Sequence, residues 1–434
     1  MMKGGGPVPE MTTPGGNLYA DEEDYQYVTA ALSRVFALSR DARDRELMAE
    51  FSTGQVRFSE LLEEMERLRA VAGLSAESPT DGSVSALMAD ASTLTRRALT
   101  REVSRLVSPL ARPSATGGAP AVAREVELIE DGPKRTGDGA KFLTILDTLN
   151  LPGSWPDRFL GYCSGHNSAA IWLLTAPTPL GPWAWVEPVV GVAGSGARLV
   201  DPSLGDHAAS PSVIWHAGKV HLYYHGPTSE NGLEQPTSLA TSQDGRAFSI
   251  SSAGSMVIPT EYANQASPYR TSTSYAQVVW AEGQLHAVWQ GTTGRDAVTP
   301  AGRYTPMPVG YGTSADGVRW VKRDPIIYSR DSGQGLMAPG LARLNDGWIV
   351  AGSQRDSDGG TTGGQVASVG CYLGPSLDRL HRVANIVLPG VRTQFINSPV
   401  FITWEGRMWM VGGVHRPGTT TPVVSAFELD WSRA

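Results

Sequence analysis

The chain has 434 residues and a formal net charge of −7, which argues against a general nucleic-acid binder. Its 49 glycines, 30 prolines and 12 tryptophans, with only 18% charged residues, are typical of an all-β protein with many turns. The two cysteines, Cys163 and Cys371, lie in apolar runs, so we expect small core residues rather than a disulfide framework or a metal site.

The N-terminal part differs in pattern from the rest. We expect a flexible Gly- and Pro-rich segment at 1–19, a small helical domain at 20–111 and a linker at 112–123. Apolar residues at helical spacing, such as Leu61, Leu62, Met65 and Leu68, support the helices. This domain is expected to serve as an anchor, as an oligomerisation module, or as a cap packed on the neighbouring domain.

Two features of the sequence bear on location. The N-terminus lacks the apolar core of a signal peptide, and no run of 18 apolar residues is present. We therefore expect no membrane span and a protein made in the cytoplasm, which is exported, if at all, as part of a larger assembly.

From 124 to 434 one pattern recurs about every 60–65 residues, a spacing typical of repeat architectures. It consists of an apolar strand, a tight turn with glycine, and a second apolar or aromatic strand. A second pattern, a strand followed by a Ser-x-Asp-Gly turn and another strand, occurs at 239–249 and 311–321. The first pattern is found at 213–226, 278–291, 341–354 and 401–413.

Together the two patterns predict four-stranded antiparallel sheets arranged radially, because one unit cannot bury its own apolar faces. The predicted fold class is an all-β five-bladed β-propeller with a small N-terminal α-helical domain. Strands within 124–131 and 141–149 are expected to complete the last sheet and close the ring. The five units are placed at roughly 158–190, 207–259, 265–329, 335–390 and 395–432.

These patterns resemble the five-bladed propellers of furanosidase-type glycoside hydrolases, such as arabinanases, β-xylosidases, invertases and levansucrases. The resemblance implies a carbohydrate ligand at the axial end of the inner strands, and two acidic residues if the protein is a hydrolase. The family's Asp-Pro acid has no match here. The corresponding dipeptides are Ser210-Pro211, Ser267-Pro268, Ala338-Pro339 and Ser398-Pro399.

Catalysis would then require acids from neighbouring positions. Asp206, just before an expected inner strand, is the candidate base or nucleophile, and Glu261 or Asp356 is the candidate acid. The alternative for each of them is a turn or solvated loop residue. No metal-ligand spacing is present, so no cofactor is predicted, although an ion on the axis stays open.

Other residues near the ends of inner strands could bind a sugar through aromatic faces and polar groups. For the aromatic residues, packing between blades is the alternative. The candidates are His207, Tyr224, His225, Arg270, Trp289, Arg355, Asn397 and His415.

The sequence leaves three functions open. The first is a carbohydrate-recognising propeller that acts on or binds a polysaccharide. The second is a non-catalytic glycan-binding spike or attachment protein of a phage-like particle or surface assembly, anchored through 20–111. The third is a structural propeller that binds other proteins.

Overall fold

A computed structural model describes two short strands near the N-terminus and most of the C-terminal three-quarters of the chain. The helical domain expected at 20–111 lies outside the described residues. The contacts divide the chain into two units, Met1–Pro109 and Leu110–Ala434, which are described separately. The described residues are 12–13, 16–17, 115, 117–129, 139–149, 151–152, 155, 157–228, 234–250, 254–261, 263–264, 267, 269–292, 308–327, 336–354, 368–389, 396–416 and 422–431.

In the first unit the structure describes one short hairpin. Its strands are β1 (Thr12–Thr13) and β2 (Gly16–Asn17), which pair antiparallel. They lie within the segment 1–19 that was expected to be flexible.

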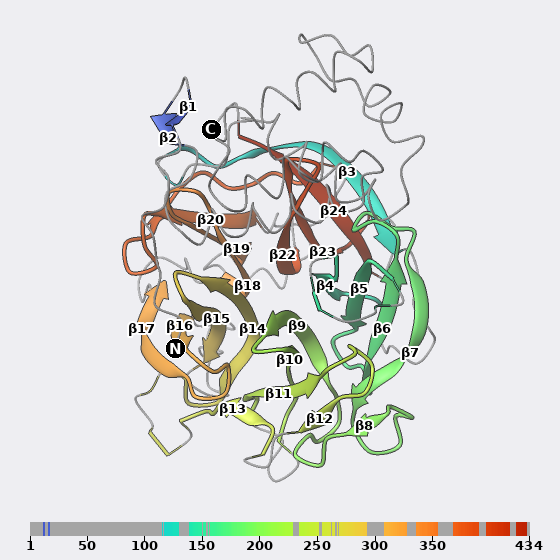
Figure 1. Ribbon diagram of the computed structural model, residues 1–434. Helices are drawn as coiled ribbons and strands as arrows, with labels where there is room; N and C mark the ends of the chain where they lie inside the picture. Colours follow the sequence, from blue (N-terminus) through green and yellow to red (C-terminus); the bar gives the residue numbers. More distant parts are fainter. Residues whose placement is uncertain are drawn as a thin grey trace, which may run out of the picture. The chain divides into compact units, whose positions relative to one another are not determined.

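The described part of the second unit is a five-bladed β-propeller, as the sequence predicts. Figure 1 shows the five sheets arranged around a common centre. Blade I contains β4 (Phe142–Asp147), β5 (Phe159–Ser164), β6 (Ala170–Ala176), β7 (Ala184–Gly191) and β8 (Leu199–Val200), and blade II contains β9 (Ala209–His216), β10 (Lys219–His225), β11 (Thr237–Ser242), β12 (Ser249–Ile250) and β13 (Met256–Ile258).

The remaining three blades each have four strands. In blades II to V the first recurring pattern forms the inner hairpin, and in blades II and III the Ser-x-Asp-Gly pattern forms the outer strands. Blade III contains β14 (Ser272–Ala281), β15 (Gln284–Thr292), β16 (Val309–Ser314) and β17 (Val321–Ile327); blade IV contains β18 (Leu336–Arg343), β19 (Trp348–Gln354), β20 (Ser368–Gly374) and β21 (His381–Arg382); blade V contains β22 (Asn397–Trp404), β23 (Arg407–Val414) and β24 (Val423–Asp430).

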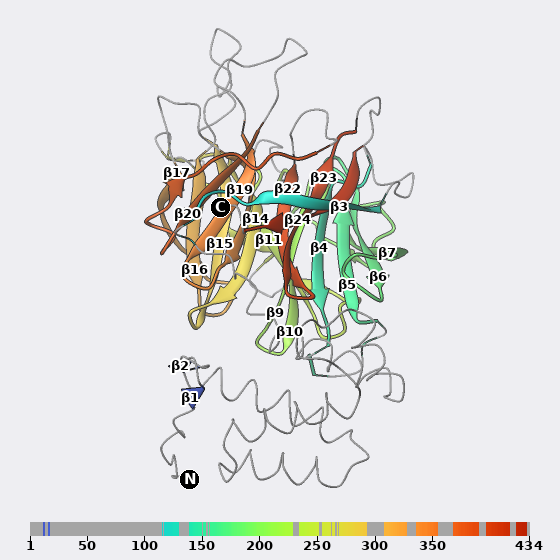
Figure 2. The same ribbon diagram turned by 90° about the horizontal axis from the view of Figure 1, so that it is seen from above.

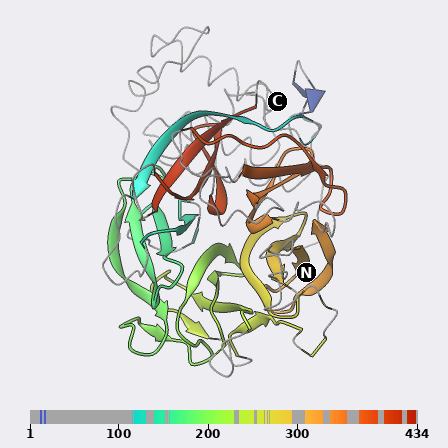
Figure 3. The same ribbon diagram turned by 180° about the vertical axis from the view of Figure 1, so that it is seen from behind.

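The ring is closed by a strand from before the first blade. The strand β3 (Ala121–Ile129) pairs antiparallel with β24 and becomes the outermost strand of blade V, as Figure 3 also shows. This part of the expected closure is confirmed. The expectation for 141–149 is wrong, because β4 is the inner strand of blade I, which begins at Phe142 rather than near 158.

Three inner hairpins turn through two residues that both have positive φ, at Ala217-Gly218, Glu282-Gly283 and Glu405-Gly406. This is the type I′ turn, whose twist matches that of the flanking strands. The glycine in each recurring pattern meets this requirement, and it fixes the register of the two inner strands.

The Ser-x-Asp-Gly turns of blades II and III each accept a hydrogen bond from the preceding blade. In blade II the Asp244 Oδ1 atom accepts hydrogen bonds from two backbone amides, and the Tyr162 hydroxyl of blade I donates to the Gly245 carbonyl at 2.8 Å. Blade III repeats this arrangement with Asp316, and the Tyr223 hydroxyl of blade II donates to the Gly317 carbonyl at 2.9 Å. The motif therefore serves both the turn and the packing between blades.

The hydrophobic core lies between the blades. Successive residues of a strand point to opposite faces, so Tyr224 packs toward blade I whereas Tyr223 packs toward blade III. Similarly Val288 packs toward blade IV and Trp289 toward blade II. The inner strands β4, β9, β14, β18 and β22 each contact the next one around the ring, and Figure 2 shows the sheets side by side.

Candidate functional site

The five inner strands run in the same direction, and they begin at one end of the propeller. In blades II to V the beginning of the inner strand carries a β-bulge with a positive-φ residue that is not glycine. Such residues are costly unless the surrounding structure holds them. We call this end of the propeller the axial end. The four bulge residues are Ser210, Tyr275, Ala338 and Ser398.

A side chain from the preceding blade holds three of these bulges. The backbone amide of Ser210 donates to Ser164 Oγ at 3.2 Å, and that of Ala338 donates to Gln290 Oε1 at 3.0 Å. The amide of Tyr275 donates to His225 Nδ1 at 3.3 Å. One structural position thus carries serine, glutamine or histidine, depending on the blade.

Four of the rings at the axial end come from blades I to III. The rings of His225 and Tyr275 lie 4.4 Å apart, and those of His207 and His225 lie 6.2 Å apart. His166 stacks on Tyr275 and also accepts or donates a hydrogen bond with its hydroxyl, at 3.1 Å. Phe142 packs edge-on against Tyr275. We call His166, His207, His225 and Tyr275 the axial cluster.

The hydrogen bond to Tyr275 fixes the protonation of His225. Because Nδ1 accepts from a backbone amide, it carries no proton, and the neutral ring holds its proton on Nε2. Burial lowers the pKa of His225 well below its usual range, and the nearby imidazoles of His207 and His166 lower it further. His225 is therefore a neutral hydrogen-bond donor at physiological pH.

A close backbone contact brings His207 and His225 together. The chain after β10 passes directly against the segment before β9, and a Cβ added at Gly226 would lie 2.1 Å from the His207 carbonyl oxygen. Only glycine fits there without a shift of backbone. Gly226 thus sets the distance between the two histidines.

The axial end contains buried polar atoms that lack hydrogen-bond partners in the described part of the chain. They are His207 Nε2, His225 Nε2, Ser210 Oγ and Ser398 Oγ. Buried polar groups are nearly always paired with protein, water or a ligand. Four such atoms lie at this end of the propeller, and others occur elsewhere among the described residues, for example Trp289 Nε1 and Trp409 Nε1 between the blades.

Of the proposed catalytic acids, Asp206 lies beside this cluster. Its Oδ1 atom accepts a hydrogen bond from His207 Nδ1 at 2.7 Å, and 82% of its side chain is exposed. The bond places the His207 proton on Nδ1, which leaves Nε2 as an acceptor when the ring is neutral. Asp206 thus orients His207 and still presents a carboxylate to solvent.

Glu261 lies at the outer side of blade III. It pairs with Lys322 Nζ at 2.6 Å, on the outermost strand β17, and accepts a short hydrogen bond from Ser267 Oγ. Burial alone would raise the pKa of Glu261, but the bonds from Lys322 and Ser267 outweigh it and lower the pKa below its usual value. Glu261 is thus held as a carboxylate, away from the axial cluster.

The other sugar-binding candidates are spread over several environments. Tyr224 is buried, and its hydroxyl donates to Asp201 Oδ2 at 2.7 Å. Trp289 is also buried; it packs on Tyr269 and covers Gly310. Both side chains fill space between blades. Asn397 begins β22 and donates a hydrogen bond to the Gly413 carbonyl. Two candidates are half-buried: Arg270, just before β14, and His415, just after β23. The candidates Arg355 and Asp356 lie outside the described residues.

Tyr275, Phe142 and His166 were not among the candidates. The sequence pairs Ser267-Pro268 with the other Ser-Pro and Ala-Pro dipeptides, but the structure places the equivalent bulge at Tyr275-Ala276. The spacing between the bulge and the turn glycine could have identified Tyr275 from the sequence. The bulge residue lies eight positions before the turn glycine in blades II, III and V, which selects Tyr275 rather than Ser267.

Within the described ranges, no group of three or more His, Cys, Asp or Glu side chains is arranged to hold a metal ion. Among the same residues, no helix has the length and hydropathy needed to cross a membrane.

No protein-family model and no curated protein matches the chain. Solved structures with a similar fold exist. A thermostable family-43 glycoside hydrolase matches with 13% identity, 73% coverage of this chain, 96% of that chain and a TM-score of 0.49.

A family 117 glycoside hydrolase of Zobellia galactanivorans has 13% identity, covers 74% of this chain and 92% of its own, and has a TM-score of 0.48. The native arabinanase Arb43A of Bacillus subtilis has 14% identity, covers 67% of this chain and 94% of its own, and has a TM-score of 0.47.

Proposed function

We propose that this propeller recognises a carbohydrate at its axial end. The observation that carries the proposal is the set of unpaired buried polar atoms at this end, one of which, His225 Nε2, belongs to a ring 4.4 Å from that of Tyr275. Sugars are typically bound by an aromatic face against their C–H surface and by polar groups around their hydroxyls. The axial cluster contains polar groups of this kind and one aromatic ring, Tyr275, which is 7% exposed.

The protonation states suit a hydroxyl ligand. His225 Nε2 offers a proton, and His207 Nε2 offers a lone pair when the ring is neutral. The hydroxyls of Ser210 and Ser398 can do either. A sugar hydroxyl is both a donor and an acceptor, so it can pair with each of these groups, whereas a purely apolar ligand would leave them unpaired.

The test is binding of pentose and fructose oligosaccharides, measured by calorimetry with the full chain. The key variant is His225→Gln, because Gln290 accepts the bulge amide at the same position of blade III. The substitution keeps this acceptor but changes the donor. We expect at least tenfold weaker binding with an unchanged unfolding midpoint. If His225→Gln binds as tightly as the wild type, or if no oligosaccharide binds at millimolar concentration, the proposal fails.

A second candidate function is hydrolysis of the bound carbohydrate with Asp206 as base or nucleophile. Its support is the position of Asp206, which is exposed and hydrogen-bonded to His207. We expect Asp206→Asn to abolish release of reducing sugar if the protein is a hydrolase. Binding with no such release from any oligosaccharide would favour the attachment function. A stable protein complex with no glycan binding would favour a protein-interaction propeller.

A further inference from the structure

One bulge at the axial end is held by a side chain that titrates. The backbone amide of Tyr275 donates to His225 Nδ1 at 3.3 Å. In blades II and IV the equivalent acceptors are Ser164 and Gln290. Serine and glutamine remain acceptors at every pH at which the protein is folded, but an imidazole loses its free lone pair when it is protonated. The bulge of blade III therefore depends on a neutral histidine.

Tyr275 needs this hydrogen bond because its backbone is strained. Its φ is 55°, in the left-handed region that is costly for a bulky side chain. A protonated His225 would turn an N–H group toward the amide of Tyr275, so that two donors would face each other. The held bulge and a protonated His225 are therefore incompatible.

The surroundings of His225 also oppose its protonation in the held state. Its neighbours on β9 and β11, Ala209 and Thr237, do not titrate. Burial, followed by the imidazoles of His207 and His166, lowers its pKa well below the usual range. A proton thus binds more readily once the bulge has moved and the ring is hydrated. The titratable groups around the ring are His207, His166, Tyr275 and, through its bond to His207, the exposed Asp206.

Release of the bulge would displace the ring of Tyr275. That ring stacks on His166 at 12°, forms a hydrogen bond with it at 3.1 Å and packs edge-on against Phe142. It is the aromatic group of the axial cluster, and His225 Nε2 is one of the cluster's donors. One proton on His225 would therefore alter both the aromatic and the polar contact to a sugar.

We propose that His225 is a positioning residue for Tyr275 and makes the axial end bind carbohydrate at neutral pH and release it in acid. The inference rests on the proposed function, because the ligand is the carbohydrate proposed there. The released state binds more protons, so it gains on the held state as the pH falls below the ordinary histidine pKa of about 6.5. At pH 5.0 one proton favours release by a factor of about 30, which is the upper limit of the effect.

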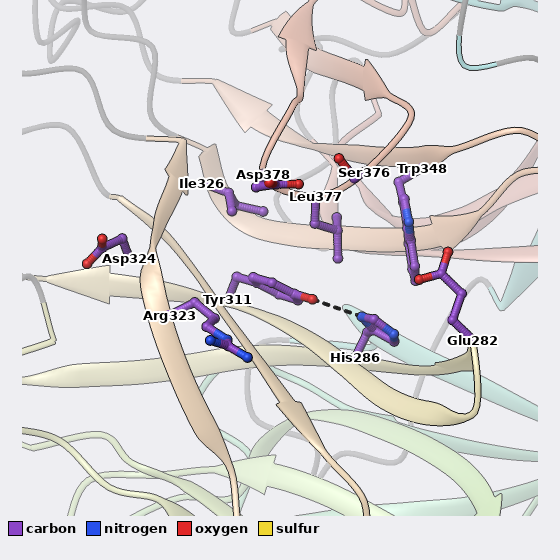
Figure 4. Close-up of a pocket in the computed structure, with 10 residues that line it drawn as sticks. All are labelled: Glu282, His286, Tyr311, Arg323, Asp324, Ile326, Trp348, Ser376, Leu377 and Asp378. Carbon is purple, nitrogen blue, oxygen red and sulfur yellow. Dashed lines mark hydrogen bonds between the residues drawn. The ribbon is translucent and has the colours of Figure 1, made fainter.

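A second buried histidine provides a matched control. His286 lines a cavity between blades III and IV, and its Nδ1 atom is hydrogen-bonded to the Tyr311 hydroxyl at 3.0 Å (Figure 4). Burial lowers the pKa of His286 more than nearby Glu282 raises it. A hydroxyl can accept as well as donate, so this bond can persist when His286 is protonated. His286→Gln therefore removes a buried histidine without removing the acceptor of a bulge.

The experiment is calorimetric titration of the full chain with arabinotriose, xylotriose and 1-kestose at pH 7.5 and 5.0. For the wild type and for His286→Gln we expect binding to weaken by between about five- and 30-fold at pH 5.0. His225→Gln keeps an acceptor for the amide; it should bind more weakly at pH 7.5 but change less than about twofold at pH 5.0. Circular dichroism at both pH values checks that the propeller is folded.

Three outcomes would overturn the proposal. One is a wild-type change below about twofold, and another is a change in His225→Gln as large as that of the wild type. The third is a pH dependence that is lost in His207→Gln and kept in His225→Gln, which would assign it to His207. If no sugar binds the wild type at pH 7.5, the proposed function itself fails.

The bulge can also be followed without a ligand. In a chain labelled with ¹⁵N-tyrosine, the amide signal of Tyr275 is the one missing from Tyr275→Phe. We expect this signal to shift or broaden between pH 7.5 and 5.0 in the wild type and in His286→Gln, and to stay constant in His225→Gln. A signal that is equally constant in the wild type would refute the role of His225, whether or not a sugar binds.

Discussion

The carboxylates of the Ser-x-Asp-Gly turns and the side chains at the axial end differ in how their hydrogen bonds are satisfied. At the turns, Asp244 and Asp316 each accept two backbone amides, and a buried tyrosine donates to the turn carbonyl. At the axial end, His207, His225, Ser210 and Ser398 keep unpaired atoms. Paired groups stabilise the fold, whereas unpaired buried groups reduce stability and are retained where a ligand can use them.

The difference follows the repeat. The turn motif is the same in blades II and III, because both turns do the same work. The bulge acceptor is Ser164, His225 or Gln290 according to the blade. The same bulge amide is thus bound by three different residue types. We infer that holding the bulge is not the only demand on this position.

The largest effect is expected from a substitution that forces the axial histidines apart. Gly226→Ala would place a methyl group against the His207 carbonyl, and we expect a loss of about 3 kcal/mol in the free energy of unfolding. Gly218→Ala has open space but a φ of 78°, so it should cost about 1 kcal/mol. Urea denaturation measures both. Equal losses of stability in Gly226→Ala and Gly218→Ala would show that a small backbone shift relieves the contact at residue 226.

The turns can be tested next by removing one hydroxyl. Tyr162→Phe and Tyr223→Phe would each leave a buried carbonyl without its donor, which should cost about 1.5 kcal/mol. The two values should agree because the motif is repeated. A loss below about 0.3 kcal/mol in either variant, measured by urea denaturation, would contradict the role of these bonds.

The buried histidines and the turn carboxylates should respond to pH in separate ranges; one of these histidines, His221, lies beside the blade III turn. Burial lowers the pKa of His221 to about 4 and that of His225 well below its usual value. The unfolded chain then binds more protons than the folded one below about pH 6.5, so stability should fall as the pH decreases from 7 to 5. His225→Gln should reduce this fall. An unchanged pH dependence would contradict a buried neutral His225.

The smallest effect is expected at the turn carboxylates. Burial would raise the pKa values of Asp244 and Asp316, but hydrogen bonds from backbone amides and from Ser242 or Ser314 outweigh it and lower both. Their contribution is present above the unfolded pKa of about 4 and lost below it. The double variant Asp244→Asn, Asp316→Asn should flatten the pH dependence below pH 4. A curve identical to the wild type would refute this.

The sequence predicts most of the propeller because its signals are local. A glycine turn such as Glu282-Gly283 and a turn such as Ser242–Gly245 define their hairpins within a dozen residues. Blade I was placed too late because β4 ends at Asp147 and β5 begins only at Phe159, without the short glycine turn. A signal based on that turn does not apply to this hairpin.

The axial cluster could be predicted only in part, because it depends on contacts between blades. His207 and His225 were found from their positions beside inner strands. Tyr275 was missed because Tyr-Ala replaces the Ser-Pro or Ala-Pro of other bulges, and its contact with His166 joins residues 109 positions apart. The inaccessibility of Tyr224 and Trp289 likewise follows from the neighbouring blade, not from their own strands.

The pairing of β3 with β24 has a consequence for biosynthesis. The two partners are separated by nearly the whole propeller, so β3 emerges from the ribosome long before the strand that it needs. Until then it has an open backbone edge, which is a hazard for association with other chains. Charged side chains on β3 oppose such association while the edge is unpaired; they are Arg124, Glu125 and Glu127. In the folded protein the two glutamates pair with Arg416.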